Sequence, residues 1–91
     1  MNLWDDVLVK LLYFAWLKTK TGMAEEDVSP PEGVGTVAEL LSWLEARGPE
    51  FADALSDRGA IRVAVNQSYA KPGDAIGPDD EVALFPPVTG G

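Results

Sequence analysis

The sequence predicts an α+β fold, in which a mixed β-sheet carries one main helix packed across one face. Several short segments of β-branched and aromatic residues alternate between apolar and polar positions, as half-buried strands do. One segment near the middle of the chain instead has apolar residues at helical spacing behind a capping motif. The 91 residues suffice for one domain with a modest core, and one helix lying across a sheet buries that helix's apolar stripe.

The first strand is predicted over 7–14, VLVKLLYF, where the alternation separates two faces. The residues of one face are Val7, Val9, Leu11 and Tyr13, and those of the other are Leu8, Lys10, Leu12 and Phe14. The following segment, AWLKTKTG, has room for about two turns of helix, closed by Gly22, which suits a left-handed C-cap. MAEEDV, at 23–28, permits a short edge strand.

Thr36 begins the clearest helix, because Thr36 and Glu39 form the Thr-x-x-Glu capping box. Apolar residues follow it at helical spacing: Val37, Leu40, Leu41 and Leu44. Gly48 and Pro49 are expected to end this helix, and PEFADAL, at 49–55, permits one further short helix.

Two more strands are predicted in the second half of the chain. AIRVAVN, at 60–66, alternates as a half-buried strand and ends at Asn66, which tolerates a turn conformation. The last strand is EVALF, at 81–85, with Val82 and Leu84 on one face and Phe85 on the other. A β-grasp topology satisfies this order of elements.

The composition excludes several kinds of chemistry. With no His and no Cys, the chain has no imidazole or thiolate catalyst, no disulfide and no Cys/His metal site. A formal net charge of −8 repels nucleic acids and anionic membrane surfaces. The acidic clusters 25–27 and 79–81 lack the ligand spacing of a calcium loop, so they are predicted to be solvated charge and no metal is expected. The longest apolar run is far shorter than a bilayer span, which favours a cytoplasmic protein.

The last strand runs directly into a stiff tail. Pro86 and Pro87 fix φ and lack N–H groups, so they end the strand's hydrogen-bond ladder and start an extended arm. Val88 and Thr89 favour extended backbone as well. The prolines therefore argue against a frayed end and for an arm that reaches away from the domain.

The tail ends in Gly90 and Gly91. Without Cβ atoms these residues make the end slim enough for a narrow channel and leave the terminal carbonyl carbon uncrowded. A carboxylate is a poor electrophile, but as an acyl-adenylate it can be attacked by a sulfur nucleophile or a lysine amine. The tail is therefore predicted to be a carrier whose reactive group is its own carboxylate.

The ending FPPVTGG, preceded by DDEVAL, resembles the small subunit of molybdopterin synthase, a family of ubiquitin-like β-grasp sulfur carriers. VKLLYFAWLKTKTG near the front and VAVNQ, at 63–67, resemble family segments too, so the likeness covers 7–91. The first six residues, MNLWDD, depart from it, and Trp4 makes them more than polar filler. The chain divides into an extension over 1–6, a β-grasp domain over 7–85 and an extended Gly-Gly tail over 86–91.

The resemblance implies a chemistry for the tail. An adenylating enzyme of the ubiquitin-activating type adenylates Gly91, and sulfur from a donor protein converts the end into a thiocarboxylate. The tail enters the active site of the large subunit, where sulfur passes to cyclic pyranopterin monophosphate to form the dithiolene of molybdopterin. The tail residues that insert are Pro86, Pro87, Val88, Thr89 and Gly90. The family assembles as a heterotetramer, binds no permanent cofactor, and its small subunit is not catalytic alone.

A β-grasp places the last strand beside the first, which predicts where a partner docks. Leu12, Phe14 and Phe85 then point away from the helix and form an uncovered apolar patch near the tail root. The alternative is that Phe14 and Phe85 complete a small secondary core under a loop.

Three other functions stay open at this point. One is a sulfur carrier for thiamine or tRNA thiolation, although those relatives generally lack the Phe-Pro-Pro-Val-Thr approach to the two glycines. Another is a ubiquitin-like modifier joined to lysines through Gly91. The third is an interaction module whose Gly-Gly has no covalent role.

Overall fold

The structure, a computed structural model, describes residues 8–87, and segments 1–7 and 88–91 lie outside the described part. Its strands are β1 (Val9–Tyr13), β2 (Glu25–Val28), β3 (Arg62–Val65), β4 (Ser68–Ala70) and β5 (Glu81–Phe85). Its helices are α1 (Trp16–Thr21), α2 (Val37–Glu45), α3 (Pro49–Ala54) and the 3₁₀ helix η2 (Arg58–Ala60). No helix within residues 8–87 has the length and apolar character needed to cross a membrane.

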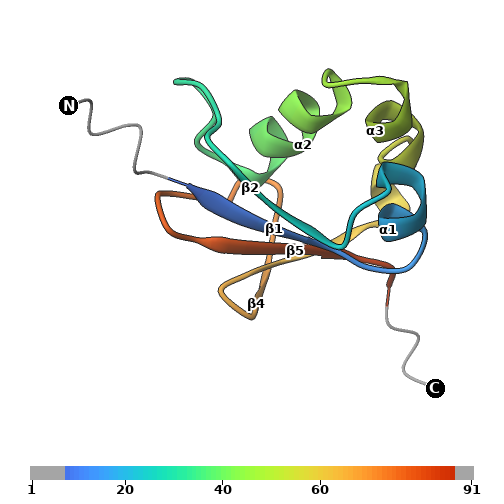
Figure 1. Ribbon diagram of the computed structural model, residues 1–91. Coiled ribbons are helices and arrows are strands. Elements are labelled where there is room, and N and C mark those ends of the chain that lie inside the picture. The colour runs from blue at the N-terminus through green and yellow to red at the C-terminus, as the bar shows by residue number, and fades with distance from the viewer. Residues whose placement is uncertain (1–7, 88–91) are drawn as a thin grey trace.

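The five strands form one mixed sheet in the order β2-β1-β5-β3-β4. The central strand β5 runs parallel to β1 and antiparallel to β3. Figure 1 shows the three α-helices on the same side of the sheet, while the other side carries no helix in the described part of the chain. The predicted α+β arrangement is therefore confirmed.

The core lies between the sheet and the helices. The predicted alternation decides which side chains enter it, because Leu11 and Tyr13 of β1 and Leu84 of β5 are almost fully buried. The α2 residues that face them are the predicted apolar stripe, Val37, Leu40, Leu41 and Leu44. The predicted start of α2 is also confirmed, since Thr36 Oγ1 accepts a hydrogen bond from the Glu39 N–H at 3.2 Å.

The sequence predicts four strands, and the structure has a fifth, β4, that was not predicted. It follows a two-residue turn at Asn66 and Gln67, which both have positive φ (52° and 70°), as in a type I′ hairpin. Asn66 is a predicted turn residue, but the next position holds Gln67 in place of the glycine that usually marks this hairpin. The three residues of β4 are also too few for an alternation to show.

The acidic cluster 25–27 is only partly solvated, so the prediction of solvated charge is wrong at Glu26. Its side chain is 15% exposed and accepts hydrogen bonds from the Tyr13 hydroxyl at 2.6 Å and from two nitrogens of Arg47 at 2.8 and 3.1 Å. Burial opposes ionisation, but the hydrogen bonds from Arg47 and Tyr13 hold the pKa of Glu26 below its usual value. This network fastens β1 and β2 to the segment that follows α2.

Candidate functional site

The tail begins where β5 ends, beside the end of β1. The register pairs Tyr13 with Leu84, and the Phe14 N–H donates to the Leu84 carbonyl at 3.1 Å. Phe14 and Phe85 therefore emerge at the same end of the sheet. The tail starts from the central strand of the sheet, because β5 is paired with β1 on one side and with β3 on the other.

One shallow apolar hollow surrounds this starting point. Its lining residues are Phe14, Ala83, Phe85, Pro86 and Pro87, and we refer to it as the tail-root hollow. Phe14 is 47% exposed. The predicted geometry is confirmed, since Phe14 and Phe85 share an uncovered surface rather than a secondary core. That this surface binds a partner stays a prediction.

The uncovered sheet face extends the hollow sideways. The register places Leu12, Ala83, Ala64 and Tyr69 next to one another across β1, β5, β3 and β4. Leu12 is half-buried beside the hollow rather than among its lining residues. The middle of this row is shallow because Ala83 and Ala64 have small side chains, and the larger Leu12 and Tyr69 flank it.

Tyr69 is a site residue that the sequence analysis did not identify. It is 75% exposed, and its ring centroid lies 5.9 Å from that of Phe85, within the range of aromatic pairing. A hairpin predicted at Asn66 and Gln67 would place Tyr69 on this face, because pairing Val65 with Ser68 brings Tyr69 opposite Ala64.

A strained turn leads from Phe14 into α1. The Leu17 N–H donates to the Phe14 carbonyl at 3.1 Å, and Ala15 between them has φ 54° and ψ −130°. These angles belong to the first central position of a type II′ turn, where glycine is favoured. The chain thus turns sharply toward the helical layer directly after Phe14.

The tail-root hollow contains no acid, base or nucleophile, since none of its five lining residues is ionisable. Its surface chemistry is that of an apolar docking site. The reactive group predicted from the sequence, the carboxylate of Gly91, lies outside the described residues, as do Val88, Thr89 and Gly90. Of the tail, the structure describes Pro86 and Pro87.

Comparison with known proteins identifies the family. The family model described as the ThiS family matches residues 11–91. The chain belongs to the ThiS family. Two relatives carry the name molybdopterin synthase sulfur carrier subunit. The human protein is 37% identical over 86 residues, with 91% of this chain and 93% of that protein covered. The Escherichia coli protein is 36% identical, with 92% and 100% covered.

A solved structure supports the same assignment of the ThiS-family fold. Small archaeal modifier protein 1 of Haloferax volcanii superimposes with a TM-score of 0.71 at 30% sequence identity, covering 90% of this chain and 99% of that one. The predicted ubiquitin-like β-grasp fold is therefore confirmed, and so is the resemblance based on FPPVTGG.

Proposed function

We propose that this chain is the sulfur carrier subunit of a molybdopterin synthase. The observation that carries the proposal is the FPPVTGG ending, which continues directly from the central strand β5 in a ThiS-family chain. The relatives named above, which are similar along nearly the whole chain, support it. A centrally held strand followed by two prolines gives a carrier a fixed base and a stiff arm.

The proposed chemistry takes place at Gly91. A carboxylate oxygen attacks the α-phosphorus of ATP in an adenylating enzyme of the ubiquitin-activating type, which forms an acyl-adenylate and releases pyrophosphate. A hydrosulfide ion supplied by a donor protein then attacks the carbonyl carbon, and AMP leaves. The resulting thiocarboxylate gives its sulfur to cyclic pyranopterin monophosphate in the large subunit. Once the sulfur is bonded to the substrate, water cleaves its bond to the Gly91 carbonyl carbon, and the tail returns to a carboxylate that can be activated again.

The tail-root hollow has the properties needed to dock the large subunit. Its aromatic and proline surface lacks charge, as the centres of protein interfaces often do. Docking at this position leaves the tail pointing into the partner, because Pro86 and Pro87 belong both to the hollow and to the arm. We propose a heterotetramer in which two copies of this chain flank a dimer of large subunits.

A second candidate function is supported by the likeness to small archaeal modifier protein 1. The same acyl-adenylate, attacked by a lysine amine instead of a sulfur nucleophile, would join Gly91 to a target protein through an amide. Peptides carrying the C-terminal residues on a lysine side chain, found by mass spectrometry in cells that express this chain, would establish that role.

Removal of Gly91 tests the proposed function. In a reaction with the large subunit, adenylating enzyme, sulfur donor, ATP and cyclic pyranopterin monophosphate, the truncated chain is expected to form no molybdopterin. A variant with one residue added after Gly91 should fail equally. Both should keep the circular dichroism spectrum and unfolding midpoint of the unaltered chain, because Gly91 comes six positions after the last residue of β5. Normal molybdopterin synthesis by either variant would contradict the proposal.

A further inference from the structure

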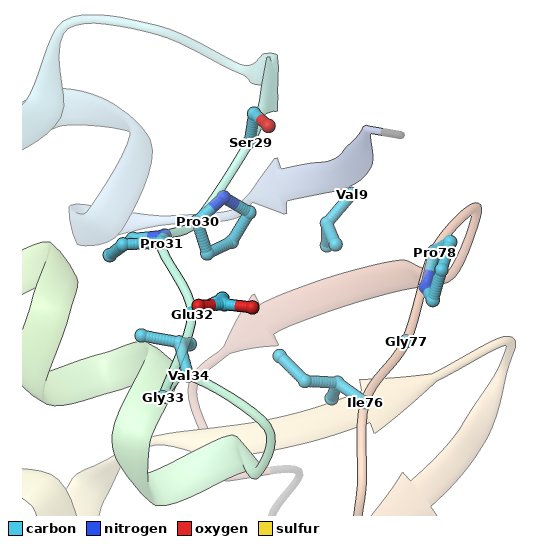
Figure 2. A pocket seen from close by; sticks show the side chains of 10 residues that line it. All are labelled: Val9, Ser29, Pro30, Pro31, Glu32, Gly33, Val34, Ile76, Gly77 and Pro78. Carbon is cyan, nitrogen blue, oxygen red and sulfur yellow. The ribbon is translucent and has the colours of Figure 1, made fainter. Parts of the chain in front are cut away.

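A second hollow lies at the end of the sheet opposite the tail. It is bounded by Val9 at the start of β1, by the loop 29–34 and by the turn 76–78 (Figure 2). Since β1 and β5 run in parallel, with Lys10 beside Glu81, Val9 and Phe85 mark opposite ends of the two strands. The hollow has a volume of about 280 Å³, enough for one large side chain, and we refer to it as the proline hollow.

The walls of the proline hollow suit an aromatic ring. Three prolines, Pro30, Pro31 and Pro78, contribute flat apolar ring surfaces to the lining, and Figure 2 shows Pro30 and Pro78 on opposite sides of the same open space. Ile76 is half-buried, and it both packs against the core and lines the hollow. Glu32 is the one ionisable residue of the lining, so its carboxylate can accept a hydrogen bond from a polar group on an otherwise apolar occupant.

We propose that Trp4 occupies the proline hollow. Trp4 precedes Val9 by five positions, and five extended residues span about 17 Å. Because Val9 lines the hollow, the hollow is within reach of Trp4. An indole combines an apolar face for the prolines with an N–H for the Glu32 carboxylate, and buried tryptophans usually find such a partner. The proposed function leaves Trp4 without a role.

The proposal assigns the N-terminal segment to the stability of the domain and not to sulfur transfer. The proline hollow lies beside the start of β1 and the loop after β2, at the end of the sheet away from Phe14 and Phe85. Replacement of Trp4 should therefore lower stability while molybdopterin formation in the reconstituted reaction proceeds unchanged.

Fluorine NMR of the full chain labelled with 5-fluorotryptophan tests the position of Trp4. The chain has three tryptophans, and the resonance missing from Trp4→Phe identifies Trp4. In the folded chain, the chemical shift of Trp4 is expected to differ from its value in the urea-unfolded chain. Ile76→Ser, which opens the hollow, should move the shift to the unfolded value. Met23→Ser, which removes a half-buried side chain near the tail end of the sheet, should leave it in place. A Trp4 resonance at the unfolded position, or one that ignores Ile76→Ser, would overturn the proposal.

A double-mutant cycle separates docking from general destabilisation. Trp4→Ala should lower the urea midpoint of the unaltered chain and of Met23→Ser by the same amount, and should have little effect in Ile76→Ser. An equal loss in all three backgrounds, or no loss in any, would show that Trp4 does not bind in the proline hollow.

Discussion

At the scale of single residues, Ala15 shows how local strain fixes part of the site. With φ 54° and ψ −130°, it holds a backbone conformation that favours glycine, and it comes directly after Phe14. Such a conformation costs a residue with a Cβ about 1–3 kcal/mol. The sequence gives no sign of this strain, because an alanine before a helix is unremarkable; the turn geometry alone reveals it.

Ala15→Gly is therefore expected to stabilise the domain. The relief of strain should outweigh the extra freedom that glycine gives to the unfolded chain, for a net gain of about 1 kcal/mol in the free energy of unfolding. Urea denaturation measures this gain. Ala52→Gly, in the exposed middle of α3, provides the control and should lose about 1 kcal/mol. A loss at Ala15 as large as that at Ala52 would mean that the turn carries no strain.

Glu26 gives a prediction for the pH dependence of stability. Its pKa in the folded chain is lowered from the ordinary value of 4.5 by the hydrogen bonds from Arg47 and Tyr13, against the effect of burial. A carboxylate with a lowered folded-state pKa stabilises the fold fully above its unfolded-state pKa, and this contribution is lost as the pH falls through the folded-state value.

Glu26→Gln should accordingly destabilise the domain at neutral pH, by about 2 kcal/mol for charged hydrogen bonds of this kind. The difference from the unaltered chain should shrink below pH 4.5, as the native carboxylate takes up its proton. Unfolding free energies of both proteins across the acid range measure it. A difference that stays constant down to full protonation would show that the charge of Glu26 contributes nothing.

At the scale of secondary structure, local patterns predict those elements whose residues carry their own signals. The capping box of Thr36 and Glu39 located α2, and Gly22, which has φ 80°, closed α1 as expected. The alternation in β1 and β5 predicted which residues of the two strands face the core, and it placed Phe14 and Phe85 on the opposite face. The strand β4 lacks such a signal, since its position depends on pairing with β3, and the row from Leu12 to Tyr69 exists only in the assembled sheet.

A charge introduced in the tail-root hollow is expected to weaken docking of the large subunit. Phe85→Glu should weaken binding to the large subunit by at least about 2 kcal/mol, because a carboxylate would be buried where an aromatic anchor packs. Isothermal titration calorimetry with the purified large subunit measures the change. Ala52→Glu, on the helical layer, is the matched control and should bind normally. Unchanged binding by a folded Phe85→Glu variant would remove Phe85 from the interface.

At the scale of the whole molecule, the fold separates its tasks along the parallel pair β1 and β5. One end presents the tail-root hollow and starts the arm, and the other presents the proline hollow beside Val9. The order of the strands makes this possible, because β5 is the last element within residues 8–87 and also the centre of the sheet. The sequence predicted the tail end from FPPVTGG, but it could not predict the proline hollow, which forms only when the loop 29–34 meets the turn 76–78.

The proposed function depends on sulfur carried by Gly91. The most direct measurement is the intact mass of the chain isolated without thiols from its own cells while they make molybdopterin, followed by fragmentation of its C-terminal peptide. We expect a fraction of the chain in which one oxygen is replaced by sulfur, with the change confined to Gly91. A chain that carries only the free carboxylate under those conditions, or one found only in amide linkage to lysine, would contradict a sulfur-carrier role.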